Sequence, residues 1–301
     1  GGTMDVAIKY FTIRNGSSGS GGGVYVPFGN DQVNLTLSNN IITACSASNG
    51  GAVAAECVNN ACTLILTNNT IVGNSANSGG GLYSATFFTT SQIIMTNNTI
   101  SGNSADNGGG VYSKVTDGFT SLTLTNNTIT GNRASTEGGG VFADGSAFYG
   151  DISIYLTNSI IWGNTSTGNG SDVFMRSNDP MDSRVIVNAT FSDIGNVENY
   201  NNNGTYNDDG TNINTDPLFV APGYWNDNGT PLDTSDDIWA GGDYHLQSGS
   251  PCIDKGTDAG APLDDFEGDQ RPVDGDGDGF ATTDIGADEY ILDSDGDGIP
   301  D

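Results

Sequence analysis

The sequence predicts an all-β protein: a right-handed, single-stranded parallel β-helix of about 29 residues per coil, followed by a loop-rich C-terminal cap. Three observations support this fold: a repeat of nearly constant length, apolar residues that alternate along each repeat, and a polar composition with few charges. Glycine accounts for 45 of the 301 residues, and charged residues make up only 15%. A disordered chain of this polarity normally carries many more charges, so this chain is expected to fold.

The repeat is visible in two independent landmarks. Glycine blocks begin at Gly21, Gly50, Gly79, Gly108 and Gly138, with a degenerate copy at Gly170. The aliphatic residue that opens each word related to LTNNT stands at Ile8, Leu37, Leu66, Met95, Leu124 and Leu156. Successive landmarks lie 29 residues apart in the first copies and 32 apart in the last. A fixed period of this length indicates a solenoid in which each repeat forms one coil.

Within each repeat the apolar residues alternate, as in Leu64 and Leu66, and this period of two indicates short strands. Equivalent residues of successive coils are then expected to stack about 4.8 Å apart, for example Ile71 on Ile100. A column of asparagines is predicted at the coil corners, where side-chain amides would bond from coil to coil and Asn would tolerate a left-handed backbone. Its members are Asn39, Asn68, Asn97, Asn126 and Asn158.

The composition changes near residue 197. Residues 201–301 hold 24 of the 37 acidic residues, and only Lys255 and Arg271 offset them. We therefore divide the chain into β-helix repeats at 1–197, an acidic C-terminal cap region at 198–290, and the start of an Asp-rich linker at 291–301. The cap region is expected to cover the apolar end of the solenoid, since an open end is a sheet edge that invites aggregation.

A net charge of −29 bears on the partners of the chain. It repels nucleic acids and anionic lipids, so neither is expected as a partner, whereas divalent cations are. No apolar run approaches the ~18 residues of a membrane-spanning helix. The chain starts inside the repeat pattern, without an initiator Met or a signal peptide, which is typical of a fragment or mature segment. Because Met4 and Val6 already alternate there, we expect upstream sequence or a neighbouring copy to cover the first coil, with end-to-end stacking as one option.

Several words spread along the chain are similar to those of a known group of proteins. NNTISGNSADNGGGVY, NSIIWGN, TDPLF, DYHLQSGSPCIDKG, FEGDQRP and DIGADEY occur in this order. They resemble bacterial secreted proteins with a right-handed parallel β-helix, of the pectate-lyase-like superfamily and the choice-of-anchor Q type. The resemblance covers nearly the whole chain and implies secretion and attachment to a bacterial surface or matrix, but no particular reaction. The final DSDGDGIPD resembles thrombospondin type 3 calcium repeats.

Calcium is the cofactor that the acidic region predicts. DGDGDG matches the first half of a D-x-D-x-D-G loop, in which spaced carboxylates wrap a hard cation and Gly permits the turn. Position twelve is Ile285, so Asp284 or a backbone carbonyl would have to close the oxygen cage. The expected ligands are Asp274, Asp276, Asp278 and Asp284, with Asp293, Asp295, Asp297 and Asp301 in the second loop. The alternative is an acidic linker that is extended by its own repulsion.

One column of charged residues is the candidate for an active site. Lys114, Asp144 and Arg176 occupy one column and would stack with alternating charge. They form either an exposed ion-pair ladder of little energetic weight, or a base with a carboxylate on a polysaccharide-binding face. No second carboxylate is aligned to complete a hydrolase pair. The single histidine, His245, is interpreted as structural.

Two further features depend on how the coils pack. If Val111 points inward, period two turns the neighbouring aromatic column outward, where it would form a sugar-stacking surface; the alternative is a packed stack covered by loops. This column comprises Tyr25, Tyr83, Tyr112, Phe142 and Phe174. Cys57 and Cys62 flank an insertion between coils, so a local disulfide is expected there in an oxidising compartment.

The first functional hypothesis is a non-enzymatic, extracellular structural or adhesion module, stiffened by calcium, with polysaccharide or copies of itself as possible partners. The alternative is a polysaccharide lyase or glycoside hydrolase with the pectate-lyase-like fold.

Overall fold

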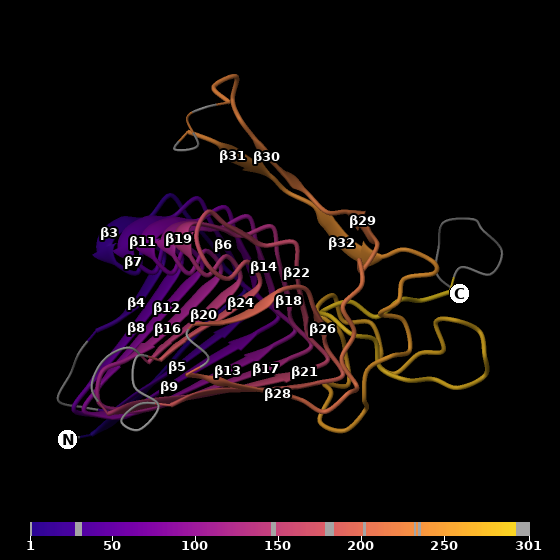
Figure 1. The fold of residues 1–301 in the computed structure, drawn as a ribbon, viewed down its shortest axis with the longest axis horizontal. Helices are drawn as coiled ribbons and strands as arrows, with labels where there is room; N and C mark the ends of the chain where they lie inside the picture. The colour runs from indigo at the N-terminus through magenta and orange to yellow at the C-terminus, as the bar shows by residue number, and fades with distance from the viewer. Residues whose placement is uncertain are drawn as a thin grey trace.

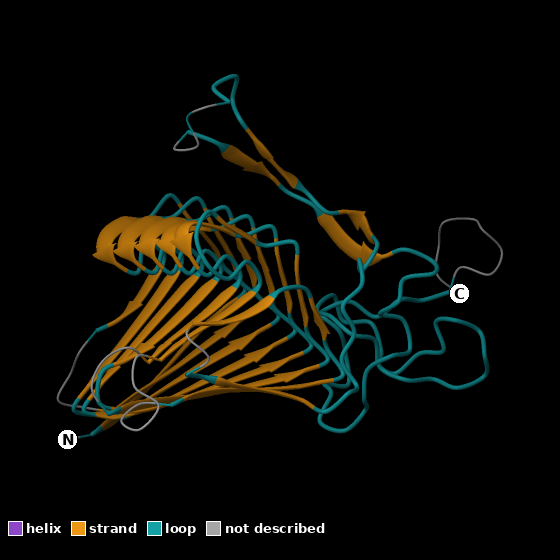
Figure 2. Cartoon of the chain, in the orientation of Figure 1, coloured by secondary structure: helices purple, strands orange, loops and turns teal. Residues whose placement is uncertain are grey.

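The chain forms a parallel β-solenoid of about six turns, as seen in a computed structural model (Figures 1 and 2). The structure describes residues 2–27, 32–145, 149–177, 184–200, 203–231, 233 and 236–292. None of the described residues forms a helix, so no segment among them could cross a membrane as one. The prediction of an all-β parallel β-helix with about 29 residues per coil is confirmed.

The coils build four parallel sheets, called A to D in the order in which the chain enters them. The first six coils contribute one strand to each sheet, and the described residues that follow add strands to sheets A, B and D only. Sheet A contains β1 (Thr3–Lys9), β5 (Gln32–Ser38), β9 (Cys62–Thr67), β13 (Thr89–Thr96), β17 (Gly118–Thr125), β21 (Gly150–Thr157), β25 (Val185–Thr190) and β28 (Thr205–Asp208). Sheet B contains β2 (Thr12–Arg14), β6 (Ile41–Thr43), β10 (Thr70–Val72), β14 (Thr99–Ser101), β18 (Thr128–Thr130), β22 (Ile160–Trp162) and β26 (Asp193–Ile194). Sheet C contains β3 (Ser17–Ser20), β7 (Ser46–Asn49), β11 (Ser75–Ser78), β15 (Ser104–Asn107), β19 (Arg133–Glu137) and β23 (Thr165–Ser166). Sheet D contains β4 (Val24–Val26), β8 (Val53–Val58), β12 (Leu82–Phe87), β16 (Val111–Val115), β20 (Val141–Gly145), β24 (Val173–Ser177) and β27 (Val197–Tyr200).

The register between coils follows the repeat. Ile71 pairs with Ile100, and Ile100 with Ile129, as the column alignment predicts. These isoleucines are fully buried and belong to one continuous apolar core that fills the solenoid. Their burial explains why such a polar chain folds: one face of each short strand supplies the core, while main-chain groups bond to the coils on either side.

The asparagine ladder lies one residue further along the chain than predicted. Asn68 and its equivalents do adopt the left-handed backbone of the corner, with φ between 49° and 57°. The amides that bond from coil to coil belong mainly to the residues that follow them: Asn69 Nδ2 donates to Asn98 Oδ1 at 2.9 Å, and Asn98 Nδ2 to Asn127 Oδ1 at 2.9 Å. In the predicted column, Asn158 Nδ2 donates to Asn126 Oδ1 at 3.3 Å. The second Asn of each pair is buried at the corner, and buried polar groups need partners. Its Nδ2 donates both to the amide oxygen of the next coil and to a main-chain carbonyl, as Asn69 Nδ2 does to Leu37 O at 2.9 Å.

A second internal ladder runs through the corner between sheets B and C. It comprises Asn74, Asn103, Asn132 and Asn164, each donating through Nδ2 to the next at 2.9 Å. At one end of the ladder, Asn164 Nδ2 donates to Asp172 Oδ1 at 2.9 Å. At the other end, Cys45 occupies the position equivalent to Asn74 in the preceding coil, and its backbone N donates to Asn74 Oδ1. Both ladders therefore clamp successive coils with buried hydrogen bonds.

Parallel pairing continues past residue 197, since β27 pairs with β24 and β28 pairs with β25. Beyond them, the loop-rich C-terminal region contains the antiparallel pairs β29 (Phe219–Ala221) with β32 (Asp243–Leu246), and β30 (Tyr224–Asn226) with β31 (Ile238–Ala240). Figure 1 shows β30 and β31 as a narrow arm beside the coils.

Much of this C-terminal region packs along the flank of the solenoid rather than over its end. Ile160, which faces out of sheet B, packs in a second apolar cluster with Phe219, Leu246 and Ile285. The corner asparagines also form hydrogen bonds with this C-terminal region: Asn126 Nδ2 donates to Gly286 O at 3.1 Å. The region thus covers the outer face of sheet B in the later coils, while Ile41 on the same face is 46% exposed.

Candidate functional site

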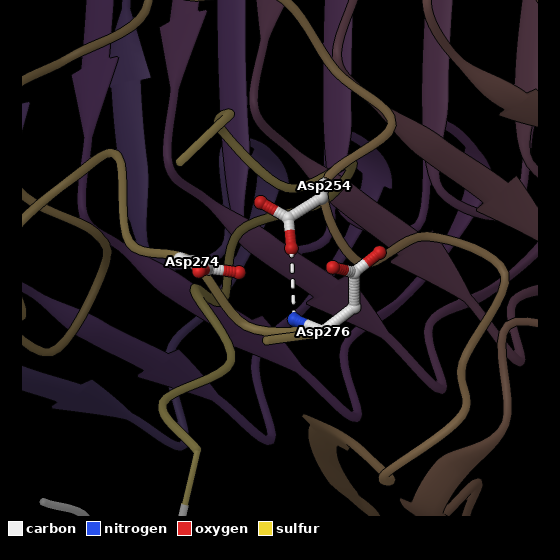
Figure 3. A group of neighbouring side chains, drawn as sticks. All are labelled: Asp254, Asp274 and Asp276. Carbon is white, nitrogen blue, oxygen red and sulfur yellow. Dashed lines mark hydrogen bonds between the residues drawn. The ribbon is translucent and has the colours of Figure 1, made fainter. Parts of the chain in front are cut away.

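The carboxylates of Asp254, Asp274 and Asp276 converge in the C-terminal region (Figure 3). One oxygen from each lies within 4.8 Å of the others. They come from two segments that are 20 residues apart, and Asp276 N donates to Asp254 Oδ2 at 2.9 Å across the gap. Carboxylate oxygens at this density fit a hard cation such as calcium, which would relieve their mutual repulsion.

Backbone amides organise the loop. Asp274 accepts from Gly277 N and Gly279 N, both at 2.8 Å, so its side chain sits inside the turn that follows it. Gly277 and Gly279 have positive φ, at 75° and 94°, which permits this tight winding. The carboxylate of Asp278 accepts from Phe280 N at 2.9 Å and lies outside the group of three.

Asp284, one of the two groups expected to close the cage, lies outside the group of three carboxylates. Its side chain is fully buried, where it accepts from Asp254 N at 2.7 Å and Tyr290 N at 2.7 Å. Burial, followed by the nearby Glu289 carboxylate, raises the pKa of Asp284 to about 8. Asp284 therefore holds the backbone of Asp254 in place, and the carboxylate that joins those of Asp274 and Asp276 is that of Asp254.

Asp254 could not be recognised from the loop motif, because it lies outside the D-x-D-x-D-G word. Its position depends on the packing of the preceding Cys252 and Ile253 into the cluster around Phe219. A nearby cation, Lys255, has its Nζ 3.8 Å from Asp276 Oδ2. The second predicted loop, with Asp293, Asp295, Asp297 and Asp301, lies outside the described residues.

The column of Lys114, Asp144 and Arg176 stacks in the predicted register. The Asp144 side chain is only 1% exposed, and it accepts from Tyr112 Oη at 2.7 Å and Arg176 at 2.8 Å. Arg176 also pairs with Glu137 of sheet C. The interpretation as an exposed ladder is therefore wrong for the Asp144–Arg176 pair, in which the carboxylate is buried and the guanidinium is 24% exposed.

The aromatic column is also buried, so the prediction of a flat sugar-stacking surface is wrong for most of it. Phe142 and Phe174 are fully buried, and Tyr112 stacks on Phe142 with ring centroids 4.7 Å apart. Tyr25 in the first coil remains 38% exposed. The column does face out of sheet D, but the glycine bends lie against it: a Cβ on Gly138 would lie 2.5 Å from Phe142 Cβ. The Arg176 guanidinium also covers the Phe142 ring, with its carbon 4.9 Å from the ring centroid.

Two smaller expectations concern a cysteine pair and the histidine. Cys57 and Cys62 form a disulfide, with Cα atoms 5.9 Å apart. His245 pairs with Asp243 and, at 2.8 Å, with Glu267. These contacts raise the pKa of His245 to about 9, although burial acts in the opposite direction. His245 thus belongs to an ion-pair network in the C-terminal region.

The comparisons with known proteins add no relative: no family model, curated protein or solved structure matches this chain.

Proposed function

We propose that this chain is a non-enzymatic structural or adhesion module of a secreted bacterial surface or matrix protein, and that calcium stiffens its C-terminal region. One observation carries the proposal: carboxylates from two separate segments, Asp254 on one side and Asp274 with Asp276 on the other, converge within 4.8 Å. A cation there would cross-link the segments that pack against the flank of the solenoid.

Two hydrogen bonds connect the three carboxylates to a corner of the solenoid. Asp254 is bonded through its amide to Asp284, and the carbonyl of Asp284 accepts from the corner residue Asn126 at 3.1 Å. Calcium binding would therefore order a loop that is two hydrogen bonds from the coil corner. A cation that binds the folded state alone stabilises it, by about 2.7 kcal/mol at a hundredfold excess over Kd.

The lyase or hydrolase alternative rests on Lys114, Asp144 and Arg176. A carboxylate that is 1% exposed and engaged by a tyrosine and an arginine is poorly placed to reach a polymer in solvent. No observation on the described residues favours this alternative, so we do not propose it.

The test is a calorimetric titration of the chelator-treated chain with calcium, together with thermal melting in calcium and in chelator. We expect saturable binding and a higher melting temperature in calcium. Asp254→Asn and Asp274→Asn should weaken both effects, whereas Asp5→Asn, which changes an exposed carboxylate on β1, should not. Absence of binding heat at millimolar calcium together with an unchanged melting curve would refute the proposal.

A further inference from the structure

All three tryptophans of the chain line one cleft. Trp162 ends β22 on the outer face of sheet B, and Trp225 and Trp239 lie opposite each other in the arm β30–β31. The cleft between the arm and the coils has a volume of about 450 Å³. Cavities of this size, with aromatic walls and few polar groups, are typical of small-molecule sites.

The arm is held in a defined position over the coil corners. Trp239 lies against the turn glycines, since a Cβ on Gly131 would come within 2.2 Å of its ring. Trp225 Nε1 donates to Gly131 O at 2.9 Å, and the Arg133 guanidinium covers the Trp225 ring with its carbon 4.0 Å from the ring centroid. Arg133 also pairs with Asp237 at the end of the arm. The walls of the cleft are therefore formed before any ligand arrives.

The polar groups around the cleft narrow the chemistry of its ligand. Asp216, Gln247 and the hydroxyl-bearing Thr130 line it, and none of the described residues that line it is basic. Tyr224 stands at its edge with 64% of its surface exposed. A carboxylate without a basic partner, in a chain of net charge −29, disfavours anionic ligands. Hydroxyl groups can donate to Asp216 while an apolar ring face packs on an aromatic side chain.

We propose that this cleft binds a segment of a neutral oligosaccharide. Pyranose rings combine an apolar face of C–H groups, which suits tryptophan and tyrosine, with equatorial hydroxyls that suit a carboxylate and an amide. The proposal rests on the adhesive part of the proposed function and names its ligand class. It uses none of the calcium-loop residues, so the two can fail separately.

The experiment titrates the full chain, in calcium, with cellohexaose, maltohexaose and mannohexaose, and with hexagalacturonate as the anionic comparison. Tryptophan emission is the readout, because every tryptophan lines the cleft. We expect a saturable change with at least one neutral hexasaccharide, and weaker or no binding of hexagalacturonate. Tyr224→Ala should weaken binding about 3- to 10-fold, the usual range for loss of one aromatic contact, while Tyr224→Phe should retain it.

The matched control is Tyr155→Ala, which removes a 45% exposed tyrosine from the outer face of sheet A. It should leave the affinity unchanged. No saturable change with any of the three neutral sugars would overturn the proposal, as would equal or tighter binding of hexagalacturonate, or an equal loss in Tyr155→Ala. The calcium titration is independent of these results and would stand or fall on its own.

Discussion

Asn126 and Gly286 are 160 residues apart in the chain, yet the Asn126 side-chain amide donates to the Gly286 carbonyl at 3.1 Å. The same amide donates to Asp284 O at 3.1 Å. A corner residue of the repeat, whose conformation is set by coil geometry, thus also serves as a docking point for the acidic C-terminal region. This contact links the two parts of the chain that differ most in composition.

The first prediction tests this docking. Asn126→Ala removes two hydrogen bonds to buried carbonyls, together with the acceptor of the Asn158 amide, and should lower the free energy of unfolding of the C-terminal region by about 1–3 kcal/mol. Asn39→Ala provides the control, because Asn39 has nearly the same φ, 57° against 53°, and is exposed. Hydrogen exchange of residues 253–290 is the measurement. Equal effects of the two substitutions would mean that backbone strain, not docking, is responsible.

The second prediction concerns the end of an internal ladder. Cys45 N donates to Asn74 Oδ1, while the Cys45 thiol lies 3.4 Å from the Thr43 carbonyl oxygen and 3.9 Å from that of Ile13. Cys45→Asn would extend the amide ladder by one residue and should raise stability by about 0.5–1.5 kcal/mol. Interrupting the ladder with Asn103→Ala should destabilise by at least about 2 kcal/mol, because buried partners lose their bonds. Urea unfolding measures both, and a destabilised Cys45→Asn would contradict this account.

The third prediction distinguishes a proposed calcium ligand, Asp254, from Asp284, which holds the backbone of Asp254. Asp254→Asn removes a carboxylate from the group of three, and should weaken calcium binding about tenfold or more. Asp284→Asn keeps an oxygen that can accept from Asp254 N, so it should change calcium affinity by less than about threefold. Calorimetry on both variants is the check. If Asp284→Asn abolished binding while Asp254→Asn did not, Asp284 rather than Asp254 would be the calcium ligand.

The fourth prediction is a dependence on pH. Burial raises the pKa of Asp193 to about 7, although Thr215 N and the Cys252 thiol donate to it. The folded state binds the Asp193 proton more tightly than the unfolded state does. The protonated side chain therefore makes its full contribution to the free energy of unfolding below about pH 4, and this contribution is lost as the pH rises to about 7. In Asp193→Asn, the loss of unfolding free energy between pH 4 and 8 should be smaller than in the unmodified chain by on the order of 2–4 kcal/mol. Melting curves from pH 4 to 8 in chelator would show it, and an unchanged slope in the variant would argue against it.

The sequence by itself determined the coil. A period of 29 residues, carried by glycine and aliphatic landmarks, is enough to set the sheet order and register, because each residue must pair with its equivalent one coil away. Alternation also placed the aromatic column correctly on the outer side of sheet D. Spacing alone could not say which Asn of each pair points inward, because a left-handed corner breaks the alternation on which that inference depends.

The tertiary structure decided whatever depends on segments that are not one period apart. The glycine bends lie against Phe142 and Phe174, and the Arg176 guanidinium covers Phe142, so residues on an outer face become buried. Asp254 joins Asp274 because the flank packs on Ile160 and the corner asparagines, none of which belongs to the acidic motif. The three tryptophans meet for the same reason. Local periodicity fixes contacts between neighbouring coils, whereas contacts made by a non-repeating chain depend on the surface that the finished solenoid offers it.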